Sequence, residues 1–103
     1  MDKIQALKAI LEQDPNNNFA RYGLGVELAN RGETDAALAE FDALLVKEPG
    51  YTAGYSQAAQ TLAAAGRIPE AIERFKAGIR CATESGNHHA ASQMQLLLDE
   101  LDR

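Results

Sequence analysis

Three observations predict an all-α protein of about six helices, stacked as antiparallel pairs in a single domain of 103 residues. Apolar residues recur at helical spacing along the chain, and no segment alternates as a strand does. Glycine or proline interrupts this pattern at short intervals, so the joints are short and successive helices lie antiparallel. The third observation is an internal repeat with a period of 34 residues.

The repeat is clearest where LANRGETDAALAEF (residues 28–41) is laid over LAAAGRIPEAIERF (residues 62–75). Alignment of the whole of 18–51 with 52–85 gives six identities, which lie at helical spacing or at a turn. Their placement, more than their number, indicates two copies of one structural unit. The identical pairs are Leu28/Leu62, Ala29/Ala63, Gly32/Gly66, Ala37/Ala71, Phe41/Phe75 and Ala43/Ala77.

The same offset extends toward the N-terminus, where LKAILEQDP (residues 7–15) aligns with FDALLVKEP (residues 41–49). It fails near the C-terminus, where Glu100 stands in place of the turn glycine. The single domain, 1–103, is therefore predicted to have four parts. They are a half repeat at 1–17, whole repeats at 18–51 and 52–85, and a C-terminal capping helix at 86–103.

Each element is bounded by residues that start or end helices. Residues 34–48 carry one apolar stripe, with Thr34 as the predicted N-cap and Pro49 as the stop. Gly32 suits the left-handed position that follows a helix, and Pro69 suits the first turn of the next one. The predicted helices are 2–13, 18–31, 34–48, 53–65, 69–84 and 88–102.

A helix–turn–helix unit of 34 residues resembles the tetratricopeptide repeat, over roughly residues 3–85. The chain departs from the family pattern in three places: Arg21 replaces a bulky aromatic residue, Ala58 and Ala59 replace Leu-Gly, and Thr83 replaces a proline. The resemblance implies a right-handed superhelix in which small residues let paired helices approach while a phenylalanine fills the gap. The matching residues are Leu24, Gly25, Leu28, Gly32, Ala37, Phe41 and Pro49 in the first unit, and Tyr55, Leu62, Gly66, Ala71 and Phe75 in the second.

In that family the first helix of each pair lines a concave face where partner peptides lie. The resemblance therefore implies a protein–protein interaction module, an adaptor or scaffold that binds a short segment of another protein. Family members that grip a C-terminal carboxylate use Lys, Arg and Asn there, whereas Tyr22, Val26, Ser56 and Gln60 occupy the corresponding area here. Apolar anchors on the partner are the better expectation. The groove positions that carry over are Phe19, Tyr22, Val26, Asn30, Ser56, Gln60, Ala63 and Met94.

Three alternatives remain open on the sequence. Phe19 and Tyr22 would have only a packing role if they seal the groove against the first helix. The first helix is expected to pack inward through Ile4, Leu7, Ile10 and Leu11, and its uncovered flank offers a surface for a homodimer. The most distant alternative is an enzyme, because the carboxylates lie in turns and on outer faces, with none paired in a pocket.

Composition argues against several other functions. The net charge is −5, and the ten basic residues are scattered among fifteen acidic ones, which disfavours nucleic-acid binding. No apolar run is long enough to span a membrane, and the single Cys81 together with the lack of signal-peptide features favours the cytoplasm. His88 and His89 point about 100° apart on a helix and cannot chelate one ion together. We therefore expect no metal, no cofactor and no catalytic residue.

Overall fold

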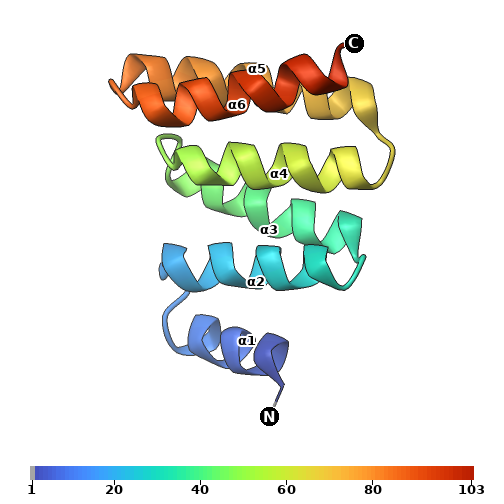
Figure 1. The fold of residues 1–103 in the computed structure, drawn as a ribbon. Coiled ribbons are helices and arrows are strands. Elements are labelled where there is room, and N and C mark those ends of the chain that lie inside the picture. Colours follow the sequence, from blue (N-terminus) through green and yellow to red (C-terminus); the bar gives the residue numbers. More distant parts are fainter. Residues whose placement is uncertain (1) are drawn as a thin grey trace.

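The computed structural model describes residues 2–103, and over this range the chain forms six α-helices and no strand (Figure 1). Every helix begins and ends within one residue of its predicted bounds, which confirms the all-α prediction. The helices are α1 (Lys3–Gln13), α2 (Asn18–Asn30), α3 (Thr34–Lys47), α4 (Thr52–Ala64), α5 (Ile68–Glu84) and α6 (His88–Leu101).

The helices stack in chain order from α1 at one end of the molecule to α6 at the other (Figure 1). The described part of the chain measures 41 × 29 × 18 Å, so the molecule is elongated along the stacking direction. The most extensive packing joins α4 to α5 and α2 to α3, while α1 packs on α2 and α6 on α5. The architecture is the predicted right-handed superhelical stack of antiparallel helix pairs.

Three turns between helices use the same backbone conformation. Gly32, Gly66 and Gly86 have φ angles of 78°, 79° and 76°, in the left-handed region that glycine adopts without strain. At the first turn the Gly32 N–H donates to the Ala29 carbonyl and the following N–H donates to the Leu28 carbonyl, each at 3.0 Å. This is the Schellman arrangement, and it explains why glycine recurs at this point of the repeat.

The predicted N-cap at Thr34 is wrong. Glu33 occupies the cap position and makes no side-chain cap bond, and α3 begins at Thr34 itself. The physical cause is the preceding turn. The Glu33 N–H donates to the Leu28 carbonyl, so Glu33 belongs to the turn that ends α2, and α3 begins at the next residue. Pro69 lies in the first turn of α5, as predicted, one residue after its start at Ile68.

The two repeats bury their phenylalanines in equivalent places. Phe41 is fully buried between α2 and α3, and a Cβ built on Gly25 would lie 2.6 Å from its Cε1 atom. Phe75 is likewise buried, in a cluster that contains Ala59, the counterpart of Gly25. Small residues therefore permit the close helix approach that the repeat pattern predicted.

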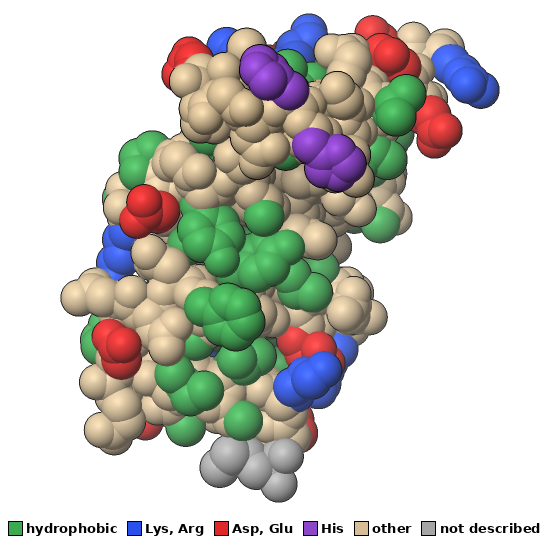
Figure 2. Space-filling view, turned by 60° about the vertical axis from the view of Figure 1, so that its left-hand side comes forward, with side chains coloured by type: hydrophobic (Ala, Val, Ile, Leu, Met, Phe, Trp, Pro, Cys, Tyr) green, Lys and Arg blue, Asp and Glu red, His purple; other side chains and the backbone are tan. Residues whose placement is uncertain are grey.

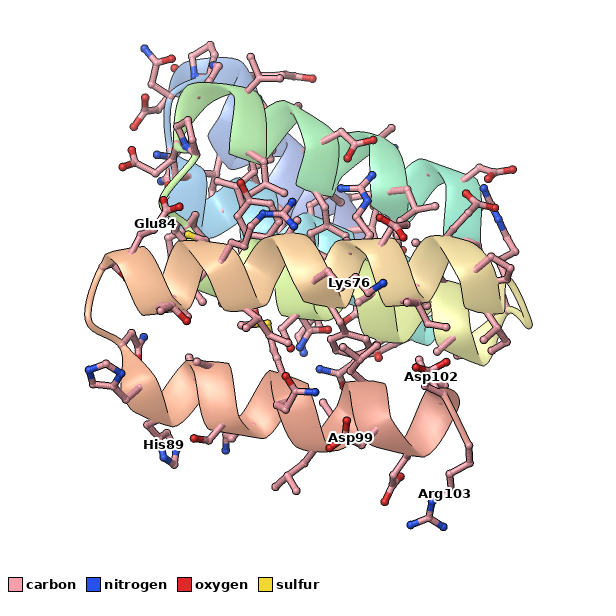
Figure 3. The ribbon with its side chains drawn as sticks, turned by 90° about the horizontal axis from the view of Figure 1, so that it is seen from above. Lys76, Glu84, His89, Asp99, Asp102 and Arg103 are labelled. Carbon is pink, nitrogen blue, oxygen red and sulfur yellow. The ribbon has the colours of Figure 1, made fainter. Side chains whose placement is uncertain are left out.

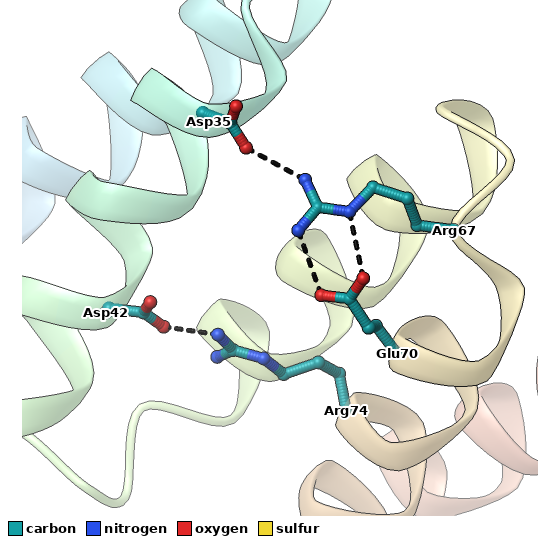
Figure 4. Close-up of polar contacts among 5 residues, drawn as sticks. All are labelled: Asp35, Asp42, Arg67, Glu70 and Arg74. Atoms are coloured by element: carbon teal, nitrogen blue, oxygen red, sulfur yellow. Dashed lines mark hydrogen bonds and ion pairs between the residues drawn. The ribbon is translucent and has the colours of Figure 1, made fainter.

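Ion pairs connect the second helices of the two repeats on their solvent-exposed side (Figure 4). Arg67, the N-cap residue of α5, donates to Asp35 of α3 at 2.8 Å, and Arg74 of α5 pairs in the same way with Asp42 of α3. Arg67 also donates two hydrogen bonds, of 3.0 and 2.9 Å, to Glu70. These bonds lower the pKa of Glu70 below its usual value. Both cross-repeat pairs join residues 32 positions apart.

The first helix, α1, takes the place of the second helix of a repeat. The Lys47 Nζ of α3 donates to the Pro15 carbonyl at 3.0 Å, again 32 positions away. The matching contact in the next unit joins the Cys81 Sγ to the Pro49 carbonyl at 3.6 Å. No helix precedes α1 within the described residues, so Ile10 is 44% exposed and does not pack inward as expected.

Candidate binding groove

A groove of about 550 Å³ lies between α4 and α6, on the face where α4 contacts both α2 and α6. Figure 2 brings one end of the helices forward and shows hydrophobic side chains gathered in the middle of this view, with charged side chains toward its margins. The groove is lined by Tyr22, Thr52, Ala53, Ser56, Gln57, Gln60, Asn87, Ala90, Gln93, Met94, Leu96 and Leu97.

The groove is open where the helices carry small side chains. On α2, Tyr22 packs against the rings of Phe41 and Tyr51, with centroid separations of 6.2 and 5.6 Å, and it fills the space beside α2. Serine and alanine occupy the corresponding positions of α4 and α6, so the equivalent space there stays empty. The three matched sets are Phe19, Tyr22 and Val26 on α2, then Ala53, Ser56 and Gln60 on α4, and the N-cap Asn87 with Ala90 and Met94 on α6.

The lining of the groove carries no charged side chain, although 24% of the residues in the chain are charged. Its polar groups are amides and hydroxyls, which both donate and accept hydrogen bonds. The Gln60 Nε2 donates to the Ser56 Oγ at 3.0 Å, which holds this amide along α4 with its oxygen left to accept from a ligand. Burial, and to a smaller extent Tyr22, raises the pKa of Tyr51 beside the groove, so the Tyr51 hydroxyl stays neutral.

Four of the eight groove residues predicted from the sequence line this groove, and a fifth lies next to it. Tyr22, Ser56, Gln60 and Met94 belong to the lining, with Met94 almost fully buried as part of the floor. Asn30 lines an adjoining pocket of about 390 Å³, which shares Gln57 and Gln60 with the groove.

The remaining three predicted residues lie elsewhere. Val26 and Ala63 are half-buried and pack against the hydrophobic core. Phe19 is 80% exposed on α2 and therefore seals nothing, whereas Tyr22 both packs on the core and forms one wall of the groove.

Comparisons with known proteins support the helical-repeat fold. No family model matches the chain. The TPR repeat-containing protein PA0015 of Pseudomonas aeruginosa is 27% identical over 100 residues, which cover 97% of this chain and 95% of that protein. The solution structure of protein BPP2914 from Bordetella parapertussis superposes with a TM-score of 0.88 at 27% identity, over 100% of this chain and 90% of that one. In sequence and in fold the chain is similar to tetratricopeptide-repeat proteins.

A further tetratricopeptide-repeat structure is similar over most of this chain. YrrB, described as a TPR protein with an unusual peptide-binding site, superposes with a TM-score of 0.78 at 27% identity. The match covers 89% of this chain and 46% of YrrB. The repeats of the chain thus have the fold of protein-interaction modules.

Sequence reasoning missed most of the groove that belongs to α6. This helix was predicted to be a cap that faces water, yet one side of it forms a wall of the groove. A signal was present, because Asn87 and Ala90 occupy the tetratricopeptide-repeat positions of Ala53 and Ser56. The lining residues that the prediction omitted are Thr52, Ala53, Gln57, Asn87, Ala90, Gln93, Leu96 and Leu97.

Other polar groups of the tetratricopeptide-repeat stack lie apart from one another. His88 and His89 are exposed in the first turn of α6, and His89 points away from α5 in Figure 3. Within residues 2–103, no group of three or more His, Cys, Asp or Glu side chains is arranged to hold a metal ion. Over the same residues, every helix is too short or too polar to cross a membrane.

Proposed function

We propose that the protein is an interaction module whose groove between α4 and α6 binds a short, uncharged, extended segment of a partner protein. The observation that carries this proposal is the composition of the lining, which combines exposed leucines and a methionine floor with four amides and no charge. The segment presents one large apolar side chain to the leucines and its backbone to the amides. The chain acts as an adaptor or scaffold in this proposal.

The apolar end of the groove is formed by α6. Met94 forms the floor, and Leu96 and Leu97 are 68% and 37% exposed beside it. Burial of a leucine-sized or phenylalanine-sized side chain against such a surface stabilises a complex by about 1.5–3 kcal/mol. This contact supplies most of the affinity that we expect.

The amides provide orientation and select against charge. Gln57 and Gln60 of α4 and Gln93 of α6 each offer donors and an acceptor, which suits the N–H and C=O groups of an extended backbone. A charged side chain or a C-terminal carboxylate would lose its hydration without gaining a partner of opposite charge in the lining. The groove therefore favours an internal, neutral segment over a charged one. The peptide-binding site described for YrrB supports binding of this general kind.

The test begins with selection of peptides from a random displayed library, followed by calorimetry with the enriched peptides. Leu97→Glu places a charge in the groove and is expected to lower the affinity at least tenfold, about 1.4 kcal/mol. Val46→Glu is the matched control, because Val46 is 82% exposed on α3 and lines none of the described pockets.

NMR shift mapping locates the same peptides. We expect the largest shifts at the groove residues of α4 and α6, and enriched peptides with an apolar residue flanked by neutral ones. Enrichment of acidic or basic peptides, or equal binding by Leu97→Glu and wild type, would contradict the proposal.

A further inference from the structure

The pocket of about 390 Å³ that adjoins the groove lies between α2 and α4, whereas the groove itself lies between α4 and α6. Figure 1 shows α4 between the other two helices. Gln57 and Gln60 of α4 line both the groove and this α2–α4 pocket, and Gln60 is exposed to solvent. An extended chain that lies in the groove can therefore continue across these two amides into the α2–α4 pocket.

The α2–α4 pocket differs from the groove in its chemistry. Alanine and glycine supply four of its nine lining residues, and these small side chains leave the space open. In the described part of the chain its lining contains no leucine, no methionine and no charged residue. We therefore expect the pocket to take a neutral polar side chain rather than a second apolar one. The polar lining residues are Asn30, Thr34, Gln57, Gln60 and Thr61.

Three of these polar side chains are available to a ligand. Thr61 is already satisfied within α4, because its Oγ1 donates to the Gln57 carbonyl at 2.7 Å, and the Gln60 amide also donates within α4. Within residues 2–103 the side chains of Asn30, Thr34 and Gln57 make no hydrogen bond to another residue. Amides and hydroxyls both donate and accept hydrogen bonds, so these three side chains can pair with an amide or a hydroxyl of a ligand.

We infer that the partner segment carries an asparagine, glutamine, serine or threonine about three residues from its apolar anchor, and that this side chain binds in the α2–α4 pocket. The inference rests on the proposed function of the groove. The spacing follows from the width of α4, because a helix with its side chains is about 10 Å across and an extended chain advances about 3.3 Å per residue. An apolar side chain in the pocket would instead cover the three available polar groups without pairing them, which is unfavourable.

The charged residues next to the pocket in the sequence determine which alternative competes most. Arg31 pairs with Asp2, and Asp35 pairs with Arg67, so these charges are already engaged. Glu33 is exposed and makes no ion pair within residues 2–103. A basic side chain attracted by Glu33 is therefore the main competitor of a neutral one.

The test measures whether one polar group of the pocket and one polar group of the peptide act together. Asn30→Leu removes an amide that lines the α2–α4 pocket and is absent from the lining of the groove. Gln13→Leu is the matched control. Gln13 and Asn30 are both exposed amides at the last residue of their helices, and Gln13 lines none of the described pockets.

Peptides enriched from the random library by the wild type are used, each with a second version in which the polar residue is replaced by alanine. Calorimetry gives the affinity of both versions for the wild type, Asn30→Leu and Gln13→Leu, and circular dichroism verifies that each variant is folded. We expect Asn30→Leu to lower the affinity by about twofold to tenfold, the range for one neutral hydrogen bond, and Gln13→Leu to leave it unchanged. The loss should disappear for the alanine version, because the peptide no longer offers a partner.

Equal binding by Asn30→Leu and wild type, or an equal loss for both versions of the peptide, would overturn the inference. Enriched peptides with a basic, acidic or apolar residue at this spacing would also overturn it. In these cases peptides that Leu97→Glu still weakens leave the proposed function intact. Binding that is insensitive to Leu97→Glu, or the absence of any enriched peptide, would overturn the proposed function and this inference together.

Discussion

In the first repeat Gly25 of α2 faces Phe41 of α3, whereas in the second repeat Ala59 of α4 occupies the place of Gly25 and Phe75 of α5 that of Phe41. Both phenylalanines are sealed from water. The first crossing has no space for the methyl group that the second contains. Each crossing is therefore adjusted to its own pair of side chains, although the backbone pattern is the same.

The junctions between units differ in a second way. On α3, Leu44 is fully buried, and its counterpart on α5 is Gly78. The space above Gly78 is taken by Met94 of α6, since a Cβ on Gly78 would lie 2.6 Å from the Met94 Sδ and 2.8 Å from the Tyr55 Cβ. The large residue is therefore Leu44, from the helix before the first junction, and Met94, from the helix after the second junction. What the two junctions share is a filled volume rather than a residue type.

The largest expected effect comes from removal of the phenylalanines. Phe41→Ala and Phe75→Ala should each lower the free energy of unfolding by about 3–5 kcal/mol. Phe41→Ala should cost more, because Gly25 has no Cβ to occupy part of the cavity. Urea unfolding followed by circular dichroism measures both, with the exposed Val46→Ala as control. A greater loss in Phe75→Ala would contradict the comparison.

The next largest effect on stability is expected when the sizes of the two side chains at the second junction are exchanged. Met94→Ala should cost about 2–5 kcal/mol, and Gly78→Leu, which copies Leu44, about 1–3 kcal/mol through overpacking. The double variant should be more stable than the sum of the single losses implies, because the new leucine fills the space that Met94 leaves. Thermal unfolding of the four proteins gives the coupling energy. Simple additivity would show that the two side chains do not share one volume.

Two glycines on α2 give a smaller and more discriminating test. Gly25→Ala should destabilise the protein by up to about 2 kcal/mol, because overpacking against Phe41 exceeds the gain in helix propensity. Gly23→Ala should instead stabilise it by up to about 1 kcal/mol, since its Cβ would meet Leu7 at an ordinary 3.5 Å. Chemical unfolding of both variants measures the signs. Stabilisation by Gly25→Ala would show that the first crossing is looser than the second.

The smallest effect concerns Arg67, which pairs with Glu70 in its own repeat and with Asp35 in the other. Because Arg67 lowers the pKa of Glu70, this pair stabilises the fold above the ordinary carboxyl value of 4.5. Its contribution is lost as the pH falls through the lower, folded-state pKa of Glu70. The difference in unfolding free energy between wild type and Arg67→Gln should therefore be present at neutral pH and shrink in acid. A difference that grows on acidification would contradict the assignment.

Helix bounds followed from the sequence because glycine turns and proline stops act locally. Gly32 and Gly66 bend the chain by backbone conformation alone, so no knowledge of neighbours was needed. The cap at Thr34 failed because the hydrogen bonds of the preceding turn, rather than side-chain preference, set the start of α3.

The groove was less predictable because it depends on what each neighbouring helix leaves uncovered. Position in the repeat pointed to Ser56 and Gln60, which line the groove in the structure. It could not show that Phe19 is exposed outside the lining of the groove. It also could not show that one side of α6 forms a wall of the groove while other residues of the helix remain exposed to solvent. Side-chain size at matched positions was the missing criterion: Tyr22 fills the space that Ser56 and Ala90 leave open.

The most direct test of the proposed function is the affinity of the Ser56→Tyr variant for a peptide that the wild type binds. This substitution copies Tyr22 onto α4 and fills the groove while leaving its charge unchanged. Circular dichroism verifies that the helices are retained. We predict that the affinity falls at least tenfold, about 1.4 kcal/mol. An unchanged affinity in the folded variant would show that partners bind elsewhere on the stack.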